Sequence, residues 1–331
     1  MTVTASAPTR VDLAGGTIDI WPLYLLHPGA QTLNAALTIR TTVRLEARAD
    51  EGIVLVSEDL GITTPPLPFD ALPHETTLPL LARLAHAFGA RGLTVTTRSD
   101  APAGAGIAGS SALNIAVTAA LSAWTGRHLD HEGILEVAKN VEAQVIRVPT
   151  GLQDYRPALY GGVAAVELGP FGAARVALPV DAAALGARLA LCYTGAPRQS
   201  GINNWEITKR RIDGDAAVTA AFDAIVDATT RMRAALVAGD WPGAGACLAE
   251  EWSTRKQLAP GVTTPTIDAL LDAARAAGAW GGKVCGAGGG GCLFALAPPD
   301  RVDAIRDLWR AAGARVLDTG IDPEGLQVTT S

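Results

Sequence analysis

The stretch from Ser99 to Ala112, SDAPAGAGIAGSSA, constrains this chain more than any other part of it. Residues 92–97 before it alternate apolar and polar side chains, which predicts a half-buried strand. Residues 112–124 after it are apolar almost all round, which predicts a buried helix. The glycines between them, which permit tight turns and a close approach of a ligand, are Gly104, Gly106 and Gly109. A loop that opens into a helix presents unpaired amides at a positive helix end, so the stretch predicts a phosphate-binding loop.

Two other interpretations of this stretch stay open. In the first, it is a strand-to-helix turn that binds no ligand, with Ser110 or Ser111 capping the helix rather than reaching a phosphate-bound metal. In the second, the glycines are the G-x-G-x-x-G fingerprint of a dinucleotide site, which requires an acidic residue about 20 positions on, at the end of the next strand. Asp130 has that spacing, but it precedes a helical pattern and is typical of a helix N-cap. We therefore favour phosphates other than those of NAD.

The composition is that of a globular protein with room for two domains in its 331 residues. The net charge of −6 argues against a nucleic-acid partner, and no Lys/Arg run stands out. We expect no membrane partner and a cytoplasmic location, because the sequence has neither a spanning apolar stretch nor a signal peptide. The four cysteines lack metal-ligand spacing and are expected to be reduced thiols. The sequence leaves a homodimer open.

Predicted strands and predicted helices both occur along the whole chain. Strands are predicted at 3–7, 10–13, 37–48, 53–56, 160–166, 188–193, 283–285, 292–296 and 315–317. Helices are predicted at 78–88, 112–124, 132–147, 203–211, 215–238, 241–258, 265–277 and 302–312. The Pro/Gly/Ala-rich region at 169–186 is the candidate boundary between a first domain, 1–180, and a second, 181–331. The second half is expected to be a sheet with helices on one face.

Two further features suggest chemistry. Asp154 follows a helix-ending Pro-x-Gly, and Glu142 lies twelve residues earlier on that helix. One of these acids could hold Mg²⁺ while the other faces a substrate hydroxyl, although an acid on an exposed helix is usually just solvated. Ordering the glycine-rich run from Gly286 to Gly291 costs much conformational entropy. We therefore favour a backbone surface that lies against a ligand, and a mobile loop is the alternative.

Three separated motifs together resemble the GHMP kinase superfamily over nearly the whole chain. They are APTRVDLAGGTID at 7–19, PAGAGIAGSSA at 102–112 and GGKVCGAGGGG at 281–291. The resemblance implies an α+β fold in two domains, the first like domain 2 of ribosomal protein S5 and the second ferredoxin-like. It also implies that ATP and Mg²⁺ are used to phosphorylate a small-molecule hydroxyl.

The resemblance assigns roles to individual residues. Asp154 and Arg10 would be catalytic, with Asp154 either a base or an orienting group, and Ser110 and Glu142 would hold Mg²⁺. The serine register is open by one, because Ala108 and Gly109 replace the usual Gly-Ser. The nucleotide phosphates would contact Pro102, Gly104, Ala105, Gly106, Ile107, Ala108, Gly109, Ser110 and Ser111. The acceptor would contact Asp19, Gly16, Thr17, Arg156, Gly288 and Gly289.

Within the superfamily the spacing at 33–36, 151–154 and 161–162 is similar to that of the heptose kinase branch. The chain departs from that branch at 17–18 and 155–157, which are neighbours of the sugar. We therefore expect a sugar or sugar phosphate as the partner molecule, a heptose or its 7-phosphate first, phosphorylated at the anomeric hydroxyl. Arg156 is expected either to pair with a distal sugar phosphate or to be an ordinary solvated arginine. Kinases of fucose, galactose, mevalonate or homoserine, and a catalytically silent relative, are the alternatives.

Overall fold

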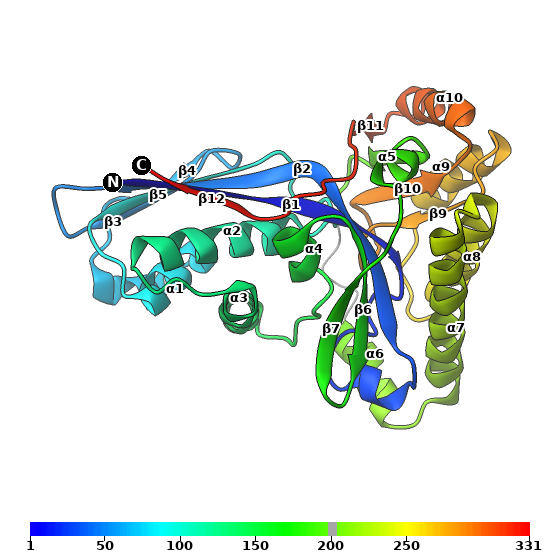
Figure 1. Ribbon diagram of the computed structural model, residues 1–331, viewed down its shortest axis with the longest axis horizontal. Coiled ribbons are helices and arrows are strands. Elements are labelled where there is room, and N and C mark those ends of the chain that lie inside the picture. The colour runs from blue at the N-terminus through cyan, green and yellow to red at the C-terminus, as the bar shows by residue number, and fades with distance from the viewer. Residues whose placement is uncertain (198–203) are drawn as a thin grey trace.

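The fold starts from two long strands, β1 (Thr2–Ala14) and β2 (Gln31–Ala47), in a computed structural model that describes residues 1–197 and 204–331 (Figure 1). They pair antiparallel along their length, from Thr2 opposite Glu46 to Ala14 opposite Leu33. Burial alternates along the first half of β1, and from residue 7 onward every residue is buried. The second half of β1 is therefore covered on both faces, and both Arg10 and Asp12 lie there.

The larger sheet has eight strands in the order β12-β1-β2-β5-β3-β4, with β6 also paired to β2 and β7 paired to β6. Its other strands are β3 (Ile53–Ser57), β4 (Ile62–Thr63), β5 (Leu93–Ser99), β6 (Val163–Gly169), β7 (Gly172–Ala177) and β12 (Gln327–Thr330). One half of β2 pairs with β6 and the other half with β5. Because β5 leads directly into the glycine-rich loop, this pairing places the loop beside the middle of β1 and β2.

Helices cover one face of the β1–β2–β5–β3 part of this sheet (Figure 1). They are α1 (Pro79–Phe88), α2 (Gly109–Trp124), α3 (His131–Ile146) and α4 (Tyr155–Tyr160). Two 3₁₀ turns, η1 (Leu23–Leu26) and η2 (Phe69–His74), complete this half. The central helix α2 is buried along most of its length, as its apolar sequence predicted. Asp130 is the predicted N-cap of α3, and its carboxylate accepts from the Gly133 amide at 2.8 Å.

The smaller sheet is antiparallel, with the order β11-β8-β10-β9. Its strands are β8 (Leu189–Tyr193), β9 (Gly281–Val284), β10 (Cys292–Leu296) and β11 (Arg315–Val316). Its helices are α5 (Ala182–Gly186), α6 (Asn204–Ile212), α7 (Ala216–Ala238), α8 (Trp241–Arg255), α9 (Pro265–Ala276) and α10 (Pro299–Ala311). This order of strands and helices confirms the ferredoxin-like expectation.

One face of the smaller sheet packs on α9 and α10, and its other face packs against β1, β2, α7 and α8. The two halves of the chain therefore share a hydrophobic core that contains residues from the second half of β1 and from β8 and β10. The same contact brings the first and third motifs together, because the first motif, 7–19, starts on β1, and the third, 281–291, contains β9 and the turn that leads to β10.

The elements that sequence patterns missed are short or exposed. Residues 327–330 are all exposed, yet they form β12 and pair with β1, so the C-terminal end of the chain returns to the first sheet. Residues 172–177 form β7 inside the predicted boundary region. The sequence did not predict this strand, because an Ala/Gly-rich edge strand carries no clear alternation of apolar and polar residues.

Asn203, the predicted first residue of α6, lies outside the described residues. No helix in the described ranges has both the length and the apolar character that crossing a membrane requires. The division of the chain at residue 180 stays a proposal.

Candidate active site

Arg10 is the point where the three motifs meet. Its guanidinium donates to Asp154 Oδ1 from Nε at 2.9 Å and from Nη2 at 2.6 Å. The remaining nitrogen, Nη1, donates to the carbonyls of Gly106 at 3.1 Å and Cys285 at 2.6 Å. A single side chain, 3% exposed, thus joins β1 to the central loop, to the third motif and to the acid that starts α4.

Neighbouring carboxylates stabilise the charged form of Arg10. Burial by itself would lower the pKa of this guanidinium, but the nearby carboxylates of Asp154 and Asp12 outweigh burial and raise the pKa. Both hydrogen bonds to Asp154 use Oδ1, so Oδ2 is the oxygen that this contact leaves available. The Asp154 side chain is 32% exposed, which gives a substrate access to that oxygen.

The central loop supplies backbone donors rather than charged side chains. Gly104, Gly106 and Ala108 all have positive φ, and Ala108 is the N-cap of α2. In the described part of the chain, the amides of residues 106–111 donate to no protein acceptor, and Ala112 donates the first bond of the helix. Consecutive free amides at a helix N-terminus form a concave anion site. Ser110 and Ser111 do not cap α2, so the capping interpretation is wrong.

Glu142 on α3 lies beside both serines. Its carboxylate is 3.4 Å from Ser110 Oγ and 3.5 Å from Ser111 Oγ, and it also accepts a short hydrogen bond from the Tyr155 hydroxyl. Burial is the main reason that the pKa of Glu142 is raised, and the Asp154 carboxylate adds to it. Since both serines are within reach of the same carboxylate, the geometry leaves the register between them open.

This donor set fits Mg²⁺ bound together with a nucleotide. Mg²⁺ prefers oxygen ligands and is usually held by one or two carboxylates plus substrate phosphates rather than by an all-protein cage. A carboxylate and two hydroxyls beside a free-amide loop match that pattern. No group of three His, Cys, Asp or Glu side chains suited to a metal occurs in residues 1–197 and 204–331, so the phosphates would have to supply the other ligands.

Asp19 is held by the backbone of the segment that precedes Asp154. Its Oδ2 accepts from the amides of Leu152 at 2.6 Å and Gln153 at 2.8 Å. The chain can approach so closely because residue 151 is glycine: a Cβ there would lie 2.1 Å from Asp19 Oδ2. Burial raises the pKa of Asp19 to about 6, although the two amides act in the opposite direction.

A pocket joins these groups. The described residues that line it are Arg10, Thr17, Asp19, Ile20, Gly151, Gln153, Asp154, Asn204, Arg255, Gly286 and Ala287. It therefore contains the acid–arginine pair, the second acid and the start of the third glycine motif, and it draws residues from both halves of the chain. A hydroxyl held here would face the Asp154 carboxylate on the side away from Arg10 Nε.

Comparison with known proteins identifies the family. The family pattern described as "GHMP kinases N terminal domain" matches residues 76–162, and "GHMP kinases C terminal" matches residues 232–315. Galactokinase of Mycobacterium tuberculosis H37Rv is 30% identical over 94% of this chain and 93% of its own length. The chain belongs to the GHMP kinase family. It is thus an ATP-dependent kinase of a small molecule.

Two other relatives of this GHMP kinase carry heptose in their names. The D-glycero-alpha-D-manno-heptose 7-phosphate kinase of Campylobacter jejuni is 27% identical over 98% of each chain. The crystal structure of a D-glycero-D-manno-heptose 1-phosphate kinase from Bacteroides thetaiotaomicron superposes with a TM-score of 0.78 over 99% of both chains, at 21% identity. The superposition supports the GHMP kinase fold that the motifs implied.

Four of the six predicted acceptor contacts are absent from the described lining of the pocket: Gly16, Arg156, Gly288 and Gly289. Gly288 and Gly289 are buried against residue Val262: a Cβ on Gly288 would lie 2.1 Å from the Val262 carbonyl, and the Gly289 amide donates to that carbonyl at 3.0 Å. They serve close packing, which explains their left-handed backbone. The part of the motif that lines the pocket is Gly286 and Ala287.

Arg156 also differs from both of its predicted roles. It is buried rather than solvated, at 5% exposure. Its guanidinium donates to Glu132 at 2.8 Å and to the Ala173 carbonyl at 2.9 Å, and it is absent from the described lining of the pocket. Arg156 therefore ties α4 to α3 and β7, and its position does not support a contact with a distal sugar phosphate.

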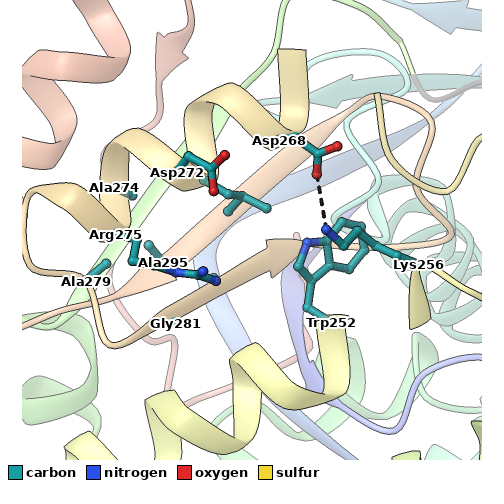
Figure 2. Close-up of a pocket in the computed structure, with 11 residues that line it drawn as sticks. Trp252, Lys256, Asp268, Asp272, Ala274, Arg275, Ala279, Gly281 and Ala295 are labelled. Atoms are coloured by element: carbon teal, nitrogen blue, oxygen red, sulfur yellow. Dashed lines mark hydrogen bonds and ion pairs between the residues drawn. The ribbon is translucent and has the colours of Figure 1, made fainter. Parts of the chain in front are cut away.

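A second hollow lies between α8, α9 and β9, and it carries none of the predicted site residues (Figure 2). Lys256 and Asp268 face each other across it at 3.4 Å, and Asp272 and Arg275 project from α9 beside them. Its charges balance, and each of the paired side chains is more than one third exposed. The pocket around Arg10, which does contain predicted site residues, is therefore the candidate kinase site.

Sequence reasoning missed residues of that pocket, among them Arg255 and Gln153. It also missed Tyr155, a partner of Glu142 outside the described lining. Arg255 comes from α8, far from all three motifs, and carries no motif signal. Tyr155 stood out only as a departure from the heptose branch, yet its hydroxyl binds Glu142. Gln153 lies one residue before Asp154, within the 151–154 stretch that is similar to the heptose kinase branch, but that similarity assigns it no role of its own.

Proposed function

We propose that this GHMP kinase transfers the γ-phosphoryl group of ATP to the anomeric hydroxyl of a sugar or sugar phosphate, and that the acceptor is a heptose or heptose 7-phosphate. The observation that carries the proposal is the pair of carboxylates in one pocket, Asp154 held by Arg10 and Asp19 held by two backbone amides. A carboxylate accepts hydrogen bonds from neighbouring hydroxyls, as a polyol requires. The relative from Campylobacter jejuni named for heptose 7-phosphate supports the substrate class.

The proposed reaction forms a bond between the acceptor oxygen and the γ-phosphorus and breaks the bond to the β-bridging oxygen, releasing ADP. Asp154 Oδ2 orients the hydroxyl and receives its proton, while Arg10 fixes the carboxylate through Oδ1. The free amides at the start of α2 bind the phosphates of ATP. Ser110 and Glu142 would hold Mg²⁺, which supplies positive charge to the phosphate oxygens when bound. Positioning and electrostatics thus account for the rate.

The test is an ADP-release assay over a panel of acceptors at saturating ATP and Mg²⁺. The panel contains free and 7-phosphorylated heptoses, galactose, fucose, mannose, mevalonate and homoserine, and ³¹P NMR of the product identifies the hydroxyl that is phosphorylated. We expect the highest kcat/KM with a heptose or its 7-phosphate and a product phosphorylated at the anomeric carbon. Faster turnover of mevalonate or homoserine than of every sugar would contradict the proposal. Asp154→Asn, run in parallel, controls for a contaminating kinase.

A kinase of galactose is the second candidate, because the galactokinase of Mycobacterium tuberculosis reaches 30% identity. The same panel separates the two candidates. A kcat/KM for galactose above that of both heptoses would replace the heptose proposal while keeping the sugar kinase class.

A further inference from the structure

Four buried charged side chains form a cluster behind the acceptor pocket. Asp12, Glu251 and Lys283 are fully buried and Arg255 is 3% exposed. Lys283 Nζ lies 3.0 Å from Glu251 Oε1 and 3.4 Å from Asp12 Oδ2. Arg255 Nη2 lies 2.7 Å from the same Glu251 oxygen and 3.4 Å from the same Asp12 oxygen. The cluster therefore has two carboxylates and two cations, drawn from β1, α8 and β9.

Buried ion pairs are poor sources of stability, because desolvation cancels most of their attraction. A cluster of this size therefore calls for another role, and its contacts suggest one. Glu251 Oε2 and Asp12 Oδ1 have no hydrogen-bond partner in the described part of the chain, so the carboxylates are not arranged for maximal pairing. The contacts instead concentrate on Arg255, whose Nε and Nη2 both donate to Glu251.

Arg255 in turn holds the loop that carries Asp19. Its Nη2 donates to the Gly16 carbonyl at 2.9 Å. A Cβ on Gly16 would lie 2.1 Å from Asp12 Oδ2 and 2.7 Å from Arg255 Nη2, so the loop rests directly on the cluster. The next residue, Thr17, has φ +76°, which is unusual for a β-branched side chain. Such backbone strain persists only where the surroundings fix it, and it gathers at functional sites.

One nitrogen of Arg255 remains for a ligand. In the described part of the chain, Nη1 contacts only Thr17 Oγ1, at 3.5 Å, a distance at the limit for a hydrogen bond. Arg255 lines the pocket together with Asp19 and Asp154. Nη1 is therefore a candidate donor in the same pocket as the acceptor carboxylate of Asp19.

We infer that Arg255 is a specificity-determining residue of this kinase: its Nη1 donates a hydrogen bond to one oxygen of the acceptor while Asp19 accepts from a neighbouring hydroxyl. This inference rests on the proposed sugar kinase function. The charges of the lining balance, with Arg10 and Arg255 opposite Asp19 and Asp154. Adjacent hydroxyls of a neutral sugar can accept a hydrogen bond from Arg255 and donate one to Asp19. A substrate carboxylate at this place would instead be repelled by the Asp19 carboxylate. Glu251 is then a positioning residue that aims the guanidinium.

The decisive variant is Arg255→Lys, which keeps a cation in the cluster but loses the fork that binds Glu251, Gly16 and the acceptor together. We expect kcat/KM for the sugar to fall about 10- to 100-fold, the range for a hydrogen bond to a charged group, with KM for ATP unchanged. Glu251→Gln should raise KM for the sugar less, without lowering kcat. The control is Lys256→Met, the next residue along, which lies in the second hollow.

A series of monodeoxy sugars tests the contact without relying on the stability of a variant. In the wild-type enzyme, removal of the hydroxyl that faces Arg255 should lower kcat/KM about tenfold, and in Arg255→Lys the same removal should cost little. If no deoxy position loses activity, or if Arg255→Lys leaves kcat/KM unchanged, the Arg255 contact is overturned while the sugar kinase function stands. If the wild-type enzyme turns over no sugar at all, the proposed function fails and the contact fails with it.

Discussion

The proposed nucleotide side and the proposed acceptor side of the active site consist of different kinds of chemical group. On the proposed nucleotide side, the loop before α2 offers a row of backbone amides that have no acceptor among the described residues. The hydroxyls of Ser110 and Ser111 lie beside the Glu142 carboxylate. On the proposed acceptor side, the lining carries charged side chains, each of which already has a partner within the protein. The first side is a property of one continuous stretch of chain. The second exists only after residues from β1, α4, α8 and the third motif have come together.

This difference teaches which kind of specificity each side can have. Backbone amides at a helix end bind any phosphate, so the nucleotide side suits a donor that all family members share. Paired side chains fix the positions of individual donors and acceptors, so the acceptor side can discriminate between hydroxyl patterns. Substitutions on the acceptor side should therefore alter substrate choice and turnover while leaving the affinity for ATP intact.

The largest expected effect is that of Asp154→Asn. We predict a loss in kcat of about 10²- to 10⁴-fold, the range for a positioned acid–base group, because the amide cannot receive the hydroxyl proton. Binding of a non-hydrolysable ATP analogue, measured by calorimetry, should not change. Asp303→Asn, at a side chain 89% exposed and far from the pocket in sequence, is the matched control. Turnover near that of the wild-type enzyme would remove Asp154 from the mechanism.

Asp19→Ala tests the acceptor side directly. We predict a fall in kcat/KM for the sugar of about 10- to 100-fold, because a buried carboxylate that accepts from hydroxyls is lost. KM for ATP should stay nearly constant, and this contrast is the readout. Equal losses in the sugar and ATP parameters would instead mean that the amides of Leu152 and Gln153 lose their anchor and the whole site collapses.

The nucleotide side was predictable from sequence because its signal is local. Glycine spacing between a strand pattern and a helix pattern was enough to predict the loop, and the structure adds the left-handed turns at Gly104, Gly106 and Ala108. The fold of the two halves followed from the resemblance of three motifs. The short strands at the edges did not, because β7 and β12 are exposed and bury little apolar surface.

The acceptor side was predictable only in part. Asp154 and Asp19 lie in motifs, whereas Arg255 reaches the pocket through the packing of α8 on β9, which no local pattern encodes. Arg156 was misjudged for the same reason: its neighbour in sequence is Asp154, but its partners in space are Glu132 and Ala173. Gly288 and Gly289 show that a glycine run can serve close packing as well as ligand contact.

A smaller effect is expected at the metal position. Glu142→Gln should raise the Mg²⁺ concentration for half-maximal rate by about tenfold, because a charged oxygen ligand becomes a neutral one. Ser110→Ala should act in the same direction, and Ser111→Ala settles the register: whichever serine variant shifts the Mg²⁺ titration is the ligand. An unchanged titration in all three variants would make Glu142 a partner of Tyr155 only.

The smallest effect, and the one that sharpens the comparison most, is the pH dependence of the acceptor side. Burial raises the pKa of Asp19 to about 6, and the carboxylates of Asp154 and Asp12 add to the rise. Arg255 is a positively charged group that interacts with Asp19. Because the pKa of Asp19 is higher in the folded protein than in the unfolded chain, the folded protein holds the Asp19 proton more tightly. The resulting contribution to the free energy of unfolding is complete below about pH 4 and is lost as the pH rises through 6.

Activity should run the other way, because the ionised form of Asp19 accepts hydroxyl hydrogen bonds best. At saturating ATP, kcat/KM for the sugar should fall about tenfold between pH 7 and pH 5, as expected for a single group that titrates near 6. Asp19→Asn should have a lower but flatter profile over that range, and its thermal midpoint should no longer decline between pH 4.5 and 7. If Asp19→Asn keeps the loss of activity at acid pH, a group other than Asp19 titrates. Glu142 on the nucleotide side is then the first candidate, because burial also raises its pKa.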